Sequence, residues 1–298
     1  MRASRVFLWT CLAALALGCP SPAPVESDPE YLAEIQKHRT AREERLRSEE
    51  GWLSLVGLYW LAVGENRFGA DPSNDLVLSE DSAPAHAGSL HYDGQTVRAV
   101  AASGVEITVD GVPIGERELT SASPDVLRLG RLRLYIIERS GRHGVRVKDP
   151  ESPARTGFTG LEYFPTDLRY RFRGKFKRFA EPREMAIPTV LGTPTPMLAP
   201  GLVEFDLDGE THTLLPLVSD PDDTEFFFIF KDLTSGHETY AAGRYLYGDL
   251  EGEEVAVDFN RTYNPPCVFT PFATCPLPPP ENRMAVRVEA GEKVYGNH

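Results

Sequence analysis

The chain has no excess of positive charge, and this argues against one large class of partners. It carries 31 Lys and Arg residues against 44 Asp and Glu, which gives a formal net charge of −13. Proteins bind nucleic acids largely through basic patches that neutralise phosphates. We therefore expect no nucleic-acid partner, and no electrostatic adhesion to anionic lipid.

The common cofactor and metal motifs are also missing. The sequence contains no Gly-rich phosphate loop, no dinucleotide-binding fingerprint and no haem-attachment CxxCH. Zinc sites usually combine closely spaced cysteines with histidines at short spacing. Only His212 and His237 are available to complete such a set with Cys267 and Cys275. We predict neither a cofactor nor a metal site.

The apolar run at the N-terminus, Val6–Leu17, is too short to span a bilayer, which takes about 20 residues. It follows a short basic segment with Arg2 and Arg5, as in a secretory signal peptide. The tail of this run, ALGC, resembles the lipobox of bacterial lipoproteins. That resemblance implies a lipoprotein signal peptide over residues 1–18, with cleavage before a lipid-bearing Cys19.

Lipidation at Cys19 predicts a cell-envelope protein whose membrane contact is its lipid anchor. Pro20 rather than aspartate follows the cysteine, which resembles the pattern sent to the outer membrane in Gram-negative bacteria. The alternatives are an ordinary signal peptide or an uncleaved anchor. Residues 19–28 then form a short proline-containing tether.

Cys267 and Cys275 are the cysteines that remain beyond the leader and the lipobox. Export would place them in an oxidising compartment, where a disulfide persists. A disulfide is the favoured interpretation. Two free buried cysteines remain an alternative, because the surrounding prolines can hold the sulfur atoms apart, and a redox or nucleophilic cysteine is a minor one.

Residues 29–50 are expected to form a helix, with Asp28 as its N-cap and Pro29 as its first residue. Its apolar face is thin and consists of Tyr31, Leu32, Ile35 and Leu46. This pattern favours a solvated helix that lies on the domain over a helix that binds a partner.

The rest of the chain predicts a mainly β protein with two β-sandwich or barrel-like domains after that helix. Residues 51–150 alternate short strands with turns about every ten residues, as in a β-sandwich. Residues 154–298 form a second β-rich domain. In it, residues 225–233 (EFFFIFKDL) are apolar on both faces, which indicates a central strand covered on both sides.

The first of these domains resembles a forkhead-associated (FHA) domain in residues 65–90, 108–111 and 119–137. In that family a β-sandwich binds phosphothreonine through loops at one end, using an arginine, a serine and a histidine. In this chain Ala70 follows Gly69 where the arginine is expected. Ser82 and His86 are one residue too far apart, and Asp110 replaces an asparagine. The resemblance implies the scaffold without its phosphate site.

The second domain resembles the family catalogued as domain of unknown function 1684. The matching residues are FFFIFKDLTSGHETYAAGRYLYGDL (226–250) and VDFNRTYNPPCVFTPFATCPLPPPENRMAVRVEAGEKVYG (257–296). The similarity extends back through GLEYFPTDLRYR (160–171) and GWLSLVGLYWLAVGENRFGADPSND (51–75). This resemblance implies no activity, because the family has none assigned.

Polar residues near the ends of the predicted strands of this domain form the candidate site. If the strands that hold residues 228–232, 244–249 and 255–260 are neighbours, these side chains meet at one end of the sheet and suit a polar ligand such as a sugar or a carboxylate. The alternative is that they cap turns and bond the proline-rich backbone. The candidate ligand-binding residues are Arg244, Asp258, Asn260, Tyr263, Asn264 and His237.

These observations predict an exported bacterial lipoprotein that binds a small molecule or a protein in the cell envelope. The alternative is an uncharacterised hydrolase-like enzyme that uses the same polar residues. Ser235 and His237 are available to join an aspartate in a triad, but the sequence Thr234-Ser235-Gly236 is not the GxSxG turn of many hydrolases. Whether the protein is an enzyme stays open.

Overall fold

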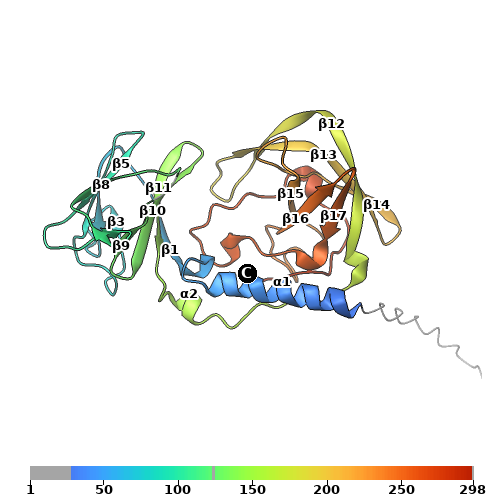
Figure 1. Ribbon diagram of the computed structural model, residues 1–298, viewed down its shortest axis with the longest axis horizontal. Helices are drawn as coiled ribbons and strands as arrows, with labels where there is room; N and C mark the ends of the chain where they lie inside the picture. The colour runs from blue at the N-terminus through green and yellow to red at the C-terminus, as the bar shows by residue number, and fades with distance from the viewer. Residues whose placement is uncertain (1–27, 123–124, 297–298) are drawn as a thin grey trace, which may run out of the picture.

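The computed structural model describes residues 28–122 and 125–296, which form one long helix and two β domains (Figure 1). The predicted signal peptide, Cys19 and most of the tether lie outside the described residues. The helix α1 (Pro29–Arg47) begins at Asp28, whose carboxylate accepts from the backbone N–H groups of Glu30 and Tyr31. Within the described part of the chain, no helix is long and apolar enough to cross a membrane.

The N-terminal domain is a sandwich of two sheets. One sheet has the order β1-β11-β10-β9-β6-β7, and the other has the order β3-β2-β4-β5-β8. Inward side chains from both sheets, such as Phe68, Leu90, Leu134 and Val147, form one core. The strands are β1 (Leu55–Trp60), β2 (Gly64–Gly69), β3 (Leu76–Val77), β4 (Gly88–Tyr92), β5 (Val97–Ala101), β6 (Thr108–Val109), β7 (Val112–Pro113), β8 (Glu116–Leu119), β9 (Leu127–Leu129), β10 (Leu132–Arg139) and β11 (Arg142–Lys148).

The C-terminal domain is a single curved sheet with the order β14-β13-β12-β17-β16-β15. Isolated bridges pair Leu198 of β13 with Val218, and Leu217 with Phe227 of β15. Through residues 217 and 218 these bridges connect β13, near one end of the sheet, with β15 at the other end. The sheet therefore curves into a barrel, and we call its strands the barrel wall. Its strands are β12 (Arg171–Ile187), β13 (Thr195–Leu207), β14 (Glu210–Leu214), β15 (Glu225–Phe230), β16 (Arg244–Glu251) and β17 (Glu254–Asp258).

Side chains of β15 are covered on both of its faces. Phe226, Phe228 and Phe230 lie in the core inside the barrel, and Ile229 packs into a second cluster outside it. The strand is the last in the sheet order, so double coverage does not come from a central position. It comes from the C-terminal segment, which packs against the outer face. The predicted fold class, two β domains after one helix, is confirmed.

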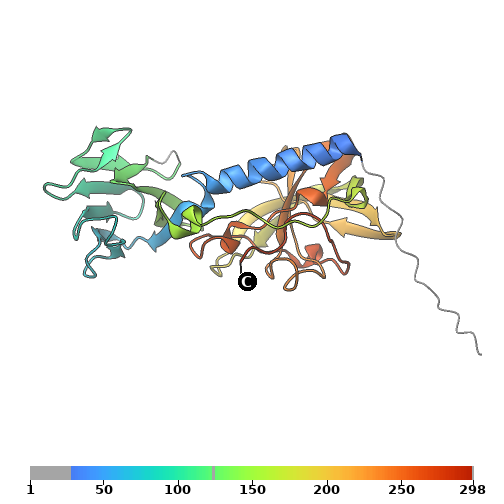
Figure 2. The ribbon, with the colours of Figure 1, turned by 90° about the horizontal axis from the view of Figure 1, so that it is seen from below.

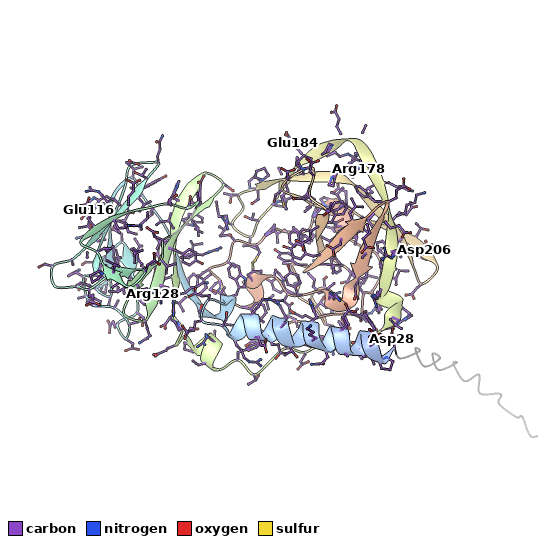
Figure 3. All side chains as sticks on the ribbon, in the orientation of Figure 1. Asp28, Glu116, Arg128, Arg178, Glu184 and Asp206 are labelled. Atoms are coloured by element: carbon purple, nitrogen blue, oxygen red, sulfur yellow. A yellow bond between two sulfur atoms is a disulfide. The ribbon has the colours of Figure 1, made fainter. Side chains whose placement is uncertain are left out.

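The strand β12 bends sharply, which helps the sheet curve. Its register with β13 shifts between Arg178 and Arg183, and Figure 3 labels Arg178 and Glu184 on the bend. Such an irregularity increases the local twist of a strand pair.

Residues 259–296 follow the last strand and wrap around the barrel without a long element of their own. Ala273 and Cys275 pack on the outer face of the wall, whereas Met284, Val288 and Ala290 join the inner core. A disulfide joins Cys267 to Cys275, with a Cα–Cα distance of 6.2 Å. The buried Asn282 ties the segment to the wall, because its amide donates to the carbonyl oxygens of Leu215 and Ile229. The short helices are α2 (Pro153–Thr156) and the 3₁₀ turns η1 (Trp52–Ser54), η2 (Leu168–Tyr170), η3 (Phe259–Arg261), η4 (Pro266–Val268) and η5 (Pro280–Asn282).

The helix α1 lies along the C-terminal domain and ends near the junction with the sandwich (Figures 1 and 2). Tyr31, Ile35, Arg42 and Leu46 are buried, whereas Leu32 stays exposed. The spacing of the buried residues places them on one face of the helix. One of them is a charged arginine, which is why the apolar face looked thin in the sequence.

Candidate functional site

A row of aromatic rings crosses the outer face of the barrel wall beneath α1. Phe227 of β15 stacks on Tyr247 of β16, with ring centroids 4.9 Å apart and planes at 28°. Tyr247 lies parallel to Tyr263, with centroids 6.3 Å apart and planes at 14°. We call these three residues the aromatic row. The ring of Tyr247 is its open member, since 47% of that residue is exposed.

The helix and the wall enclose two adjoining cavities, which we call the α1 groove. One has a volume of about 440 Å³ and includes His38, Arg42 and Tyr263 in its lining. The other has about 430 Å³ and includes Glu34 and Asp258. They adjoin because Tyr247, Asp249 and Arg261 line both. Cavities of this size suit a small ligand.

Charges of both signs line the groove, and most of them are paired. Arg261 bonds Glu34 and also lies 3.3 Å from Asp258. Arg42 pairs with the buried Glu292. Arg45 and Arg171 make no salt bridge with any described carboxylate, which leaves two exposed guanidiniums at the groove.

The neutral groups of the groove are held neutral by burial. Desolvation, with smaller effects from Arg261 and Arg45, lowers the pKa of His38 below its ordinary value of 6.5. Burial raises the pKa of Tyr247 and of Tyr263. At neutral pH the groove therefore offers an uncharged imidazole and two protonated phenols, which both donate and accept hydrogen bonds.

Two of the predicted site residues, Asp258 and Tyr263, line this groove. Asp258 ends β17, and its carboxylate accepts from the Tyr31 hydroxyl at 2.9 Å and from the backbone N–H of Asn260 at 3.0 Å. Tyr263 lies two residues beyond η3. Its backbone pairs with Tyr245, and its ring lies under the Arg42 guanidinium, 5.0 Å away.

Arg244 lies away from the groove, inside the domain, with only 1% of its surface exposed. Its guanidinium donates to Asp232 at 3.1 Å and to the carbonyl oxygens of Val288 and Ala290 at 2.8 and 2.5 Å. Asp232 also accepts from the backbone N–H of Val288 at 2.7 Å. Arg244 and Asp232 thus bind the C-terminal segment to β16. A buried charge of this kind needs an opposite charge and hydrogen-bond partners to offset its lost hydration.

Asn260 and Asn264 also point into the protein. The amide of Asn260 bonds the Tyr31 hydroxyl at 2.9 Å and the backbone of Asp167 through both its nitrogen and its oxygen. Asn264 donates its side-chain N–H to the carbonyl of Lys293 at 2.7 Å. Both side chains hold backbone segments together.

His237 lies on an exposed turn and lines neither cavity of the groove. The neighbouring Ser235 hydroxyl donates to Asp232, whose other carboxylate oxygen is bonded by Arg244. No cluster of three or more His, Cys, Asp or Glu side chains in the described part of the chain is placed to hold a metal ion.

The groove residues that the sequence did not reveal are His38, Arg42, Tyr247 and Arg261. Two of them are on α1, far from the second domain in the chain. The buried positions 31, 35, 42 and 46 repeat at helical spacing, and including Arg42 in that stripe would have signalled the buried face. The position of Tyr247 in its strand also indicates an outward side chain. It lies between two buried residues, Leu246 and Gly248, and neighbouring residues of a strand face opposite sides.

Comparison with known proteins relates each domain to solved structures. The FHA domain of FhaA, in complex with the intracellular domain of Rv3910, is 20% identical, covers 30% of this chain and 97% of its own length, and has a TM-score of 0.23. The Rv0020c FHA structure is 21% identical, covers 32% and 91%, and has a TM-score of 0.22. These likenesses are too weak to argue function. No curated protein matches the chain.

The second domain has a nearer relative. The solution NMR structure of an uncharacterized protein of Haloarcula marismortui is 32% identical, covers 48% of this chain and 80% of its own, and has a TM-score of 0.40. A family model described as protein of unknown function (DUF1684) matches residues 156–293, which hold the barrel and the wrapping segment. The chain therefore belongs to the DUF1684 family of proteins of unknown function.

Proposed function

We propose that this protein is a lipid-anchored binding protein of the bacterial cell envelope and that its α1 groove takes a sugar-like ligand. The observation that carries the proposal is the half-exposed Tyr247 ring, stacked on Phe227 and surrounded by hydrogen-bonding groups. The apolar face of a sugar ring stacks on such a platform while its hydroxyls bond side chains at the edge.

The groups around the row match the hydroxyl-rich edge of such a ligand. Asp249 supplies acceptors, Arg45 supplies donors, and the neutral His38 supplies one of each. Arg261 and Asp258 already pair with each other, so they orient the edge of the groove without a free charge. This balance favours a neutral polar ligand over a strongly charged one.

The proposed lipid on Cys19 accounts for the proposed location in the cell envelope. Eight residues separate Cys19 from Asp28. A fully extended stretch of this length spans at most about 30 Å, because each residue contributes roughly 3.3–3.6 Å. A lipid on Cys19 would therefore hold α1 and the groove close to a membrane surface, where envelope glycans are within reach.

A binding screen tests the ligand assignment. The intact protein is titrated with neutral oligosaccharides by calorimetry, and Tyr247→Ala is compared with Tyr247→Phe. We expect a sugar to bind, Tyr247→Ala to lose at least tenfold in affinity (about 1.4 kcal/mol), and Tyr247→Phe to lose less. Val112→Ala, an exposed change on β7 of the sandwich, is the matched control. Equal affinity in Tyr247→Ala and the unmodified chain, or no sugar bound, contradicts the assignment.

Mass spectrometry of the protein from its host tests the anchor. We expect an N-terminus at Cys19 carrying acyl chains, and a soluble, unacylated product from Cys19→Ser. An unmodified N-terminus, or an intact leader, would remove the anchor from the proposal.

A further inference from the structure

A separate cavity of about 470 Å³ lies between the two domains. The end of the β10–β11 hairpin forms one side, and β13, β15 and residues 273–276 form the other. The Ser140 hydroxyl at the tip of this hairpin donates to the carbonyl of Pro194, which joins the two sides. Apolar side chains cover much of the lining, among them Trp52, Met197 and Phe227.

One deeply buried charged side chain in this lining lacks a counter-charge. Arg146 of β11 is only 6% exposed, yet it makes no salt bridge with any carboxylate in the described ranges. Its Nε has no hydrogen-bond partner, its Nη2 makes a long bond, 3.3 Å, to the Thr274 hydroxyl, and the guanidinium also shares a side-chain hydrogen bond with Tyr135. The guanidinium lies over the Trp52 ring, 5.1 Å from its centroid.

The two less exposed basic neighbours on the same strands, Arg133 and Lys148, are paired. Arg133 donates to Glu49 at 2.5 Å and its Nε lies 3.0 Å from Glu50, and Lys148 lies 3.3 Å from Glu50. In the sheet, Arg133 is opposite Lys148 and Tyr135 is opposite Arg146. Carboxylates from the segment after α1 thus reach the neighbouring cations but not Arg146.

Leaving a buried guanidinium unpaired is costly, because a charge loses its hydration when it is buried. Burial accordingly lowers the pKa of Arg146, the Tyr135 phenol opposes that shift, and the nearby Arg139 adds to it. The one carboxylate in the lining is Glu138, which is half-exposed at the rim and faces His143 at 3.8 Å. An arginine stays charged under these conditions, so the cavity has a fixed positive charge in an apolar wall.

We propose that this cavity binds an amphipathic carboxylate, with its anionic head on Arg146 and its apolar body against Trp52, Met197 and Phe227. The free Nε and the weakly bonded Nη2 form one edge of the guanidinium, which matches the two oxygens of a carboxylate. The apolar remainder of the cavity provides room for a chain or ring. Glu138 at the rim disfavours a multiply charged anion. Trp52 lines both this cavity and the α1 groove, but the two sites share no charged residue.

Calorimetry and thermal unfolding of the intact protein test the proposal with three probes. Octanoate has both the charge and the chain, 1-octanol has the chain alone, and acetate has the charge alone. We expect octanoate to bind at least tenfold more tightly than either of the others. Octanoate is also expected to change the Trp52 fluorescence in a Trp9→Phe, Trp60→Phe background. Equal binding of octanoate and octanol, or of octanoate and acetate, would overturn the assignment.

Variants of Arg146 provide a second test of the proposal. Arg146→Met should weaken octanoate binding at least tenfold, retain octanol binding, and leave the unfolding temperature of the free protein unchanged or higher. The unfolding temperature should not fall, because the change removes an unpaired buried charge. If Arg146 only stabilised the fold, its removal would lower the unfolding temperature. Arg146→Gln repeats the test if the methionine variant does not fold. Arg133→Met, which removes a paired neighbour, should retain octanoate binding. Octanoate binding that survives Arg146→Met contradicts the proposal.

Discussion

Arg42, in the C-terminal half of α1, bonds Glu292, with 2.8 Å between Nε and Oε1. Both side chains are buried, and Glu292 is only 1% exposed. The other carboxylate oxygen of Glu292 accepts from the backbone N–H of Asn264 at 2.7 Å, and Arg42 donates to the Asn264 carbonyl at 3.0 Å. The pair therefore fastens the helix, the wrapping segment and the chain end at one point beneath the groove.

Removing Arg42 should destabilise the protein strongly. Arg42→Ala leaves the Glu292 carboxylate buried without its cation, so we expect a loss of about 3–5 kcal/mol in the free energy of unfolding. Chemical denaturation measures this loss. Arg47→Ala removes an exposed i,i+4 pair with Glu43 on the same helix and should cost less than about 1 kcal/mol.

The double variant Arg42→Met with Glu292→Met isolates the pair. Because it removes both charges together, we expect it to be more stable than Arg42→Ala. Equal losses in Arg42→Ala and Arg47→Ala would show that the buried pair does not fasten the helix.

The hydroxyl of Tyr31 should also stabilise the docking of α1. It donates to Asp258 and accepts from the Asn260 amide, both at 2.9 Å. Tyr31→Phe leaves these buried groups short of one partner, which should cost about 1–3 kcal/mol in denaturation experiments. The matched change Tyr59→Phe removes an exposed bond to the Val77 carbonyl and should cost less. Similar losses for the two variants would argue against the Asp258 network.

Stability should fall at alkaline pH. Burial, assisted by Asp258, raises the pKa of Tyr31 well above 10.0, and burial likewise raises the pKa of Tyr245. The folded state thus holds these protons more tightly than the unfolded state. Their contribution is complete below pH 10 and decreases above it, by about 1.4 kcal/mol per tyrosine per pH unit.

Absorbance at 295 nm and circular dichroism together follow this transition. We expect the buried phenols to ionise only as the protein unfolds. Tyrosine ionisation complete near pH 10 with the fold intact would contradict the prediction.

Gly291 should not tolerate a side chain. It has a φ of +76°. A Cβ there would lie 2.6 Å from the Thr262 carbonyl oxygen and 2.8 Å from that of Phe259. Gly209, in the β13–β14 turn, has a φ of +83° but open space around it. We expect Gly209→Ala to cost roughly 1 kcal/mol, the strain of a left-handed backbone.

Gly291→Ala adds a steric clash to the same strain and should cost at least about 2 kcal/mol more. Thermal denaturation of the two variants gives the comparison. Equal unfolding temperatures would mean that the segment shifts freely away from the wall.

The sequence by itself determined which elements form. Asp28 before Pro29 specified the start of α1, because local backbone chemistry decides it. Alternation of apolar residues predicted the two β domains for the same local reason. Residues 226–250 and 257–296 were enough to recognise the family.

Long-range contacts decided the site, and the sequence could not give them. Asp258 and Tyr263 were predicted from the sequence and line the groove. Asn260 and Asn264 were predicted too, but their side chains bond the backbone. Arg244 instead bonds the Val288 carbonyl inside the domain. A polar residue near a strand end looks the same in sequence whether it faces solvent or another segment.

What only the tertiary structure decided is which charges have partners. Arg42 meets Glu292 across 250 positions, whereas Arg146 meets no described carboxylate although Arg133 and Lys148 nearby do. Composition fixes the number of charges, but the free energy of each depends on burial and on groups brought close by folding. For that reason the sequence specified the β framework and the helix, and only the folded chain revealed the groove and the unpaired arginine.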